Sequence, residues 1–181
     1  AKTLHILIKD IASIDALGRL RSIFFTKTGI LTTGEFRVKE IIPYKNNKEE
    51  HILTYGAIGE LKARHPMGRA IRNHLNTTLS QEPLEKYREE KGRGAIAVYG
   101  GKTIIAGTES FLLDHNIDAA NDYQGIQVHV GVDGEYVGSI ALEETLKEEG
   151  SRVVEKLRTL GIHKVAVITG EGKAGAEGVL A

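Results

Sequence analysis

Residues 22–34, SIFFTKTGILTTG, carry the pattern on which the fold assignment depends. The apolar run 22–25 predicts a buried strand, and the threonines and glycines after it predict a polar loop at the end of that strand. Before the strand, apolar residues recur at helical spacing, at Ile11, Ile14, Leu17 and Leu20. The N-terminal part is therefore predicted to form a helix, a buried strand and a loop.

The same order of elements recurs at the C-terminal end. A helix is predicted after Glu143, and its apolar side consists of Val153, Val154, Leu157 and Leu160. Gly161 ends this helix, and the strand 165–168 leads into Thr169 and Gly170. A helix followed by a buried strand is half of a parallel α/β unit, in which ligands bind beyond the carboxyl ends of the strands.

The segment between these ends begins with a strand and two helices. The strand, around residues 36–41, is predicted to end at Pro43, and Asn46 or Asn47 is predicted to cap the first helix. Pro66 suits the first turn of the second helix, so the two helices should form a hairpin. Their apolar sides consist of Ile52, Leu53, Ala57 and Leu61 in the first helix and Ala70, Ile71 and Leu75 in the second.

Two turns further along predict β-hairpins. Gly100-Gly101 and Asp133-Gly134 are two-residue turns of the kind that joins antiparallel strands, whereas the polar residues 81–91 are predicted to be a link. The predicted strands are residues 95–99 and 102–106 around the first turn, and 127–132 and 135–142 around the second. The central segment is therefore expected to be α+β with an antiparallel sheet.

The composition excludes several classes of protein. The chain has 181 residues, 41% of them hydrophobic, with 24 Lys and Arg against 24 Asp and Glu, so it can bury a core but has no net charge to attract nucleic acid. Its longest uncharged stretch, residues 123–132, has ten residues, whereas a membrane helix needs about 20, so no membrane insertion is expected. The absence of cysteine favours a cytoplasmic location.

Other possible motifs lack the context that they require. The seven histidines are scattered and there is no cysteine, so no metal site is expected. The letters from Gly92 match a dinucleotide-binding fingerprint, but a strand follows where the fingerprint needs a helix. Gly101-Lys102-Thr103 matches the end of a P-loop, but the first glycine of that motif would fall on Ile96.

Several fragments, taken in order, resemble the cytoplasmic ATP-binding and phosphorylation region of heavy-metal P-type ATPases. Residues 25–32, FTKTGILT, are similar to the phosphorylation loop FDKTGTLT of this family, and residues 6–9, ILIK, are similar to its approach from the membrane. His65-Pro66 is similar to the HP motif of the heavy-metal subgroup, and Glu60 occupies the glutamate position five residues earlier.

The later fragments continue the resemblance over nearly the whole chain. Gly92 and Gly94, followed by the hairpin to Gly107, are similar to the nucleotide-domain loop of the family, and residues 169–171, TGE, are similar to TGD. The resemblance implies an α/β phosphorylation domain of haloacid dehalogenase-like type, present in part and split in two, with an α+β nucleotide-binding domain inserted into it. The implied segments are 1–33 and 143–181 for the former and 34–142 for the latter.

The resemblance also implies a site and its ligands. In the family the glutamate and histidine recognise adenine and the glycines let the loop approach the nucleotide, so ATP binding is assigned to Glu60, His65, Gly92, Gly94 and Gly107. The phosphorylation site is assigned to Thr26, Lys27, Thr28, Thr169, Gly170 and Glu171. ATP with magnesium is the expected cofactor. The remainder of a membrane-embedded transporter is the expected partner, which would make this chain a cytoplasmic part of it.

Thr26 is the most consequential departure from the family. An aspartate carboxylate forms an acyl phosphate that water can cleave, whereas a hydroxyl needs a base and gives an inert ester, so autophosphorylation is not expected. The chain ends at Ala181, before the GDGxND segment of the family, so its magnesium site is expected to be incomplete. The other departures are Ile30, Arg64, Glu144, Lys147, Glu171 and Gly172.

Two other functions are compatible with these residues. A non-catalytic, soluble ATP-binding module that regulates or binds a partner is favoured by Thr26 and by the missing segment. A small phosphatase of the same superfamily ranks lower, because such enzymes also need the nucleophilic aspartate. Apolar segments of about 20 residues on both sides of this stretch would favour the transporter.

Overall fold

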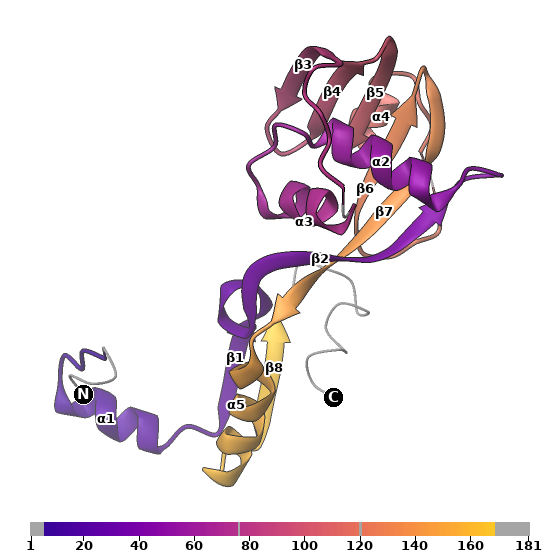
Figure 1. Cartoon of the computed structure of the whole chain (residues 1–181). Helices are drawn as coiled ribbons and strands as arrows, with labels where there is room; N and C mark the ends of the chain where they lie inside the picture. Colours follow the sequence, from indigo (N-terminus) through magenta and orange to yellow (C-terminus); the bar gives the residue numbers. More distant parts are fainter. Residues whose placement is uncertain (1–5, 76, 120, 169–181) are drawn as a thin grey trace.

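The computed structural model describes residues 6–75, 77–119 and 121–168, in which the strands form two sheets (Figure 1). The smaller sheet is the parallel pair β1-β8, and the larger has six strands in the order β2-β7-β6-β5-β4-β3. Figure 1 shows β2 and β7 leading from the smaller unit into the larger one. The predicted fold class, an α/β unit with an inserted α+β antiparallel sheet, is therefore confirmed.

The smaller sheet brings the two ends of the chain together. β1 (Ser22–Thr26) lies parallel to β8 (Lys164–Ile168), although the whole insert separates them in sequence. α1 (Ile11–Gly18) precedes β1, and α5 (Glu148–Thr159) precedes β8. The helix-then-strand order predicted for both ends is present in the structure.

β1 is less buried than the sequence predicts. Its side chains alternate between exposed and half-buried, and Phe24 is 59% exposed. The reason is that β8 is the strand that pairs with β1 within the described residues. α1 likewise has no buried residue, although Oδ1 of Asp10 accepts a hydrogen bond from the backbone N–H of Ser13 at 2.7 Å and caps the helix.

Neighbouring strands of the larger sheet are all antiparallel. Both predicted turns are present: Gly100 and Gly101 have φ values of +56° and +77°, and Asp133 and Gly134 have +51° and +85°. Positive φ at both central positions is typical of a type I′ turn. The strands are β2 (Thr32–Pro43), β3 (Leu84–Glu90), β4 (Gly94–Tyr99), β5 (Lys102–Gly107), β6 (Ile126–Val132) and β7 (Glu135–Leu146).

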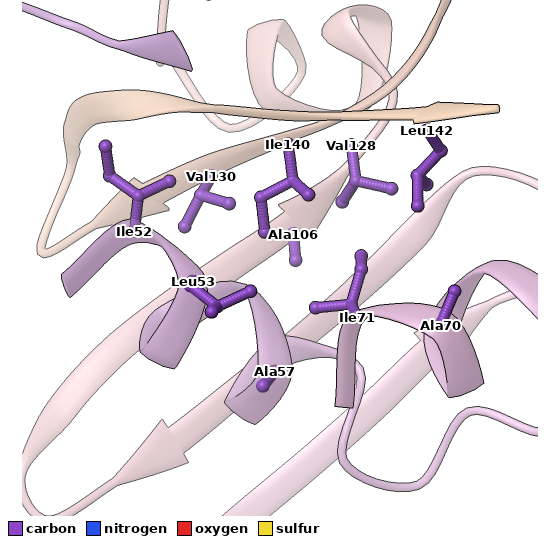
Figure 2. Close-up of a cluster of buried hydrophobic side chains, with 10 residues drawn as sticks. All are labelled: Ile52, Leu53, Ala57, Ala70, Ile71, Ala106, Val128, Val130, Ile140 and Leu142. Carbon is purple, nitrogen blue, oxygen red and sulfur yellow. The ribbon is translucent and has the colours of Figure 1, made fainter. Parts of the chain in front are cut away.

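Two helices cover one face of the larger sheet. α2 (Glu49–Gly59) and α3 (Pro66–His74) point apolar side chains at strands β5, β6 and β7 (Figure 2). The central residues of this core are fully buried, and each fully buried isoleucine or valine among them contributes about 1.5–3 kcal/mol. The core consists of Ile52, Leu53, Ala57, Ala70, Ile71, Ala106, Val128, Val130, Ile140 and Leu142. None of the described helices has the length and apolar content needed to cross a membrane.

The structure corrects the sequence prediction at three places. The predicted polar link 81–91 contains β3, an edge strand whose charged side chains do not resemble a buried strand. The short helix α4 (Glu109–Leu113) was not predicted; it packs Phe111 and Leu112 on a second cluster of buried side chains. The residue that caps α2 is Lys48, which makes no side-chain capping bond, instead of Asn46 or Asn47.

The connection between the two units is bent. β2 begins at Thr32 and β7 ends at Leu146, so both strands continue beyond the expected segment limits at 34 and 142, and α5 begins only at Glu148. Thr32 pairs with Leu146 and Phe36 with Glu144, so the register shifts between these two pairs. Gly34 lies within the shift with a φ of +76°, a value that favours glycine.

Candidate functional site

A cavity of about 740 Å³ opens at one end of the larger sheet. Its walls come from the loop between α2 and α3, the turn between β3 and β4, the end of β5 and the start of β6. All five residues assigned to ATP binding from the sequence line it: Glu60, His65, Gly92, Gly94 and Gly107. The fold thus brings together residues that are separated by up to 47 positions in the chain.

The local fold fixes Glu60 and His65 against each other. Glu60 is the C-cap residue of α2, and His65 is the N-cap residue of α3, where Pro66 takes the first helical position. Nδ1 of His65 accepts a hydrogen bond from the backbone N–H of Gly68 at 3.1 Å, so the imidazole itself caps the helix. This bond leaves Nε2 facing the carboxylate of Glu60, with Nε2 and Oε2 3.0 Å apart.

The carboxylate of Glu60 is buried but incompletely satisfied. Glu60 is 3% exposed, and Oε2 has no well-aligned hydrogen bond among the described residues, although it lies at ion-pair distance from His65. Glu60 also lines the cavity, and its carboxylate has further lone pairs that can accept from a ligand. Gly68 lets this carboxylate lie against α3, because a Cβ there would lie 2.6 Å from Oε2.

The charge of Glu60 changes the protonation of its neighbours. Its short contact with Nε2 raises the pKa of the His65 imidazole, and the partial burial of the ring opposes this effect. Burial, reinforced by the Glu60 charge, raises the pKa of Tyr87 to about 12. Tyr87 therefore remains a donor, and its hydroxyl binds the carbonyl of Gly59 at 3.1 Å.

The three glycines of the site serve different purposes. Gly92 has a φ of +77° and open space on its Cβ side, so its role is to shape the turn. Gly94 and Gly107 pair across β4 and β5, and a Cβ on either would overlap backbone of the neighbouring strand. Their lack of a side chain is therefore required by the packing of the sheet, whatever ligand the cavity holds.

Arg93 fixes the turn that carries these glycines. Its guanidinium binds Glu90 at 2.7 Å and also Asp114, and it lies over the ring of Phe111. These two carboxylates raise the pKa of Arg93. Arg93 is thus already paired with two anionic side chains, and it holds the β3–β4 turn against α4.

A polar network extends from one residue of the cavity wall. Gln127 lines the cavity, and its amide accepts from Ser139 at 2.8 Å and donates to Asn121 at 3.2 Å. Behind it, Nδ1 of His129 lies 3.1 Å from the hydroxyl of Tyr136, and burial lowers the pKa of His129. Gln127 was not predicted as a site residue because it lies in a strand predicted only from its apolar neighbours.

The residues assigned to phosphorylation lie in the smaller unit. Thr26 is the exposed last residue of β1, and Lys27 is buried at the start of a single π-turn, η2 (Lys27–Leu31), which also contains Thr28. The hydroxyl of Thr32 accepts from the N–H of Gly29 at 3.0 Å and holds this turn. The remaining three, Thr169, Gly170 and Glu171, lie outside the described residues.

Other features of the site were not predicted. Tyr87, Met67 and Thr108 also line the cavity. Tyr87 could have been suspected as the one aromatic residue in the polar stretch 81–91, whereas the sequence gives no comparable signal for Thr108. No group of three or more His, Cys, Asp or Glu within the described ranges is arranged to hold a metal ion.

Comparisons with known proteins agree on one superfamily. Residues 20–181 match the model of haloacid dehalogenase-like hydrolases. A cadmium, zinc and cobalt-transporting ATPase of Bacillus subtilis is 34% identical over 175 residues, which cover 96% of this chain and 25% of that protein. The chain thus spans about a quarter of the length of the curated relatives that it matches.

Solved structures give the same result for the fold. A zinc-transporting PIB-type ATPase in its E2.Pi state superposes with a TM-score of 0.67 and 29% identity, over 93% of this chain and 29% of that one. The catalytic domain of the CPx-ATPase CopB-B superposes with a TM-score of 0.70 over 96% of this chain and 64% of that one. The latter is 22% identical, so it supports the fold alone.

Proposed function

Because this chain belongs to the haloacid dehalogenase-like hydrolases and is homologous to the cytoplasmic catalytic domains of heavy-metal P-type ATPases, we propose that it is the ATP-binding cytoplasmic region of a heavy-metal cation transporter. The cation would be the substrate of the whole transporter, and the rest of that membrane protein would be its partner. Within this region, residues 34–142 form the nucleotide-binding part, and 1–33 with 143–181 belong to the phosphorylation part.

The observation that carries this proposal is the buried, incompletely satisfied carboxylate oxygen of Glu60. His65 is the one side chain at ion-pair distance from this buried carboxylate in the described residues, and a donor from a ligand would satisfy it further. The exocyclic amine of adenine is such a donor, and the His65 ring beside it offers a surface for stacking. Glu60 and His65 would thus hold the base.

The cavity also has groups suited to the rest of the nucleotide. The lining contains three cations, Lys62, Arg64 and Lys91, which suit a polyphosphate. It also contains the carboxylates of Glu89 and Glu90, of which Glu90 is paired with Arg93. Gly92 leaves the turn beside them free of a side chain. When bound, ATP with magnesium would supply the phosphoryl group; the residues of this chain position the base and compensate the phosphate charge.

The test of ATP binding is an NMR titration of the full chain with ATP. Amide signals of Glu60, His65, Gly92 and Gly94 should shift together with a dissociation constant on the order of 10⁻⁴ to 10⁻³ M, which corresponds to about 4–5.5 kcal/mol. A flat response at millimolar ATP would contradict the proposal.

A pair of histidine variants tests whether the cavity is responsible. His65→Ala should weaken ATP binding about tenfold, because it removes the stacking surface and one polar contact. His74→Ala is the matched control, since His74 lies on the same helix, is exposed and does not line the cavity. Equal loss in both variants would place the ATP elsewhere.

For the phosphorylation part we propose that Thr26 replaces the phosphorylated aspartate of the family and that this chain does not autophosphorylate. Thr26 is exposed at the end of β1 and has a neutral hydroxyl, which cannot form an acyl phosphate. Incubation with labelled ATP and magnesium, followed by acid quenching, should leave no hydroxylamine-labile label on the protein. Such a label on the chain would overturn this part of the proposal.

A non-catalytic ATP-binding module is the second candidate function, and Thr26 is the observation that favours it. Such a module would bind ATP through the same cavity and regulate or bind a partner. The two candidates differ in what the gene encodes on either side of this stretch. Apolar segments of about 20 residues there would identify the transporter, and their absence would favour the module.

A further inference from the structure

Arg69 lies between the cavity and the bent connection of the two units. It is in the first turn of α3, the helix that His65 caps. Nη1 donates to the backbone carbonyl of Arg64 at 3.0 Å, and Nη2 donates to the carboxylate of Glu35 at 3.1 Å. One guanidinium therefore binds the loop residue just before His65 and, with its other nitrogen, a residue of β2.

The contact between Arg69 and Glu35 lies at the connection between the two units. Glu35 follows Gly34 and lies within the register shift of the β2–β7 ladder, where β2 leaves the larger sheet for the phosphorylation turn. A few residues at the end of an element commonly absorb the change in backbone angles during a domain movement. The carboxylate that Arg69 binds is thus at the point where the two units would change their relative orientation.

The contacts of Arg69 are better suited to couple the two units than to stabilise the fold. The side chains of Arg69 and Glu35 are 46% and 60% exposed, and exposed ion pairs contribute little to folding. The planar fork of arginine can nevertheless bind two acceptors at once in a fixed geometry. A shift of the Arg64–His65 loop when a ligand enters the cavity would therefore be transmitted to Glu35.

We infer that Arg69 is a positioning residue that couples occupancy of the nucleotide cavity to the orientation of the phosphorylation unit, through its simultaneous contacts with the Arg64 carbonyl and Glu35. This inference rests on the proposed ATP binding and adds a residue to it. Coupling is reciprocal, so a link that lets ATP bias the orientation also lets the orientation change the affinity for ATP. The link acts through Arg69 without contact between Arg69 and the ligand.

The experiment measures a distance between the two units in the full chain. Because the sequence contains no cysteine, Lys86→Cys on β3 and Glu155→Cys on α5 place two spin labels at exposed positions without background labelling. Electron–electron resonance then gives the distance distribution with and without ATP, and NMR titration of the same protein gives the dissociation constant. ATP should shift or narrow the distribution in the parent chain.

Three variants separate the parts of the link. Arg69→Gln removes both contacts, and Glu35→Gln weakens only the contact with β2; both should lose most of the ATP-dependent change and bind ATP up to about 5-fold more weakly. Arg37→Gln is the matched control, because Arg37 also forms an exposed ion pair from β2, but its partner, 2.9 Å away, is Glu143 on β7 and not a residue of α3. This control should respond to ATP like the parent.

The outcomes distinguish the inference from the function on which it rests. If the parent binds ATP but Arg69→Gln keeps the full distance change, or if Arg37→Gln loses as much, the inference is wrong and ATP binding stands. If ATP binds and the parent shows no distance change, the inference is also wrong. If the parent does not bind ATP at all, the proposed function and the inference fail together.

Discussion

The larger unit of this chain has a closed core, whereas the smaller unit leaves apolar side chains uncovered. Around the six-stranded sheet, Ile52, Ile71 and Ile140 have no exposed surface. In the smaller unit, Phe24 and Ile168 are both 59% exposed, and α1 buries none of its residues in the described structure. The core of the larger unit is thus covered by its own residues, whereas the described residues leave apolar side chains of the smaller unit exposed.

The two units also differ in how their candidate functional sites are built. Every residue that lines the cavity belongs to the larger unit, whose core packs beside it. The turn Lys27–Leu31, in contrast, is held partly from the far end of the insert, where the amine of Lys147 donates to the carbonyl of Gly29 at 2.8 Å. Ligand binding is therefore expected to depend on the larger unit.

The largest expected effect comes from the core that Figure 2 shows. Ile140→Ala should destabilise the chain by about 2–5 kcal/mol, because it leaves a cavity between β7 and the helices. Phe24→Ala in the smaller unit should cost about 1 kcal/mol or less, because most of that ring is exposed. Urea unfolding measures both, and similar costs would remove the contrast between the units.

An intermediate loss of stability is expected from a glycine of the larger unit, compared with a glycine of the smaller one. Gly94→Ala should cost about 1–3 kcal/mol and weaken ATP binding, because the new Cβ would overlap the Ala106 carbonyl and the Phe111 ring. Gly18→Ala in α1 should stay within about 0.5 kcal/mol, since nothing lies near its Cβ position and its φ is not positive. Thermal unfolding and ATP titration of both variants check this; a tolerated Gly94→Ala would show that β4 and β5 can move apart.

The smallest expected effect is the change in stability with pH that the Glu60–His65 pair causes. The pKa of folded His65 is raised above 6.5 by Glu60, so this pair stabilises the fold fully below pH 6.5 and loses its contribution as the pH rises through the folded pKa. With the ring partly exposed, the contribution should be under about 1 kcal/mol. The midpoint of the His65 ring signals in an NMR titration should lie above 6.5 and should fall in Glu60→Gln. An unchanged midpoint in that variant would mean that another group sets the pKa.

Much of the fold could be predicted because its signals are local. The Asp133-Gly134 and Gly100-Gly101 turns need positive φ values, and Pro66 can start a helix but cannot continue one. β3 was missed because an edge strand is stabilised by backbone pairing with β4 and has no buried face to mark in the sequence. The exposure of β1 was missed because an apolar run predicts a strand but not the neighbours that cover it.

The site could be predicted in part, through resemblance and not through spacing. His65 was singled out for the proline after it, and the structure adds that its ring caps α3. The burial of Glu60 depends on Gly68, and the contacts of Arg69 depend on β2, which no local pattern places beside α3. Such contacts come from tertiary structure, so a single sequence contains no signal for them.

The pairing of β1 with β8 has a consequence for how the chain folds. Ser22 pairs with Lys164, so during synthesis β1 cannot pair with β8 until the whole insert has been made. Closing so long a loop is slow and costs chain entropy, but β2 and β7 are neighbours, so an insert that folds first brings the flanking segments together. This shortening of the effective loop is worth on the order of 1 kcal/mol. The antiparallel β2–β7 pair thus holds the two flanking segments close together, and β1, although it is synthesised before the insert, is expected to join the fold after it.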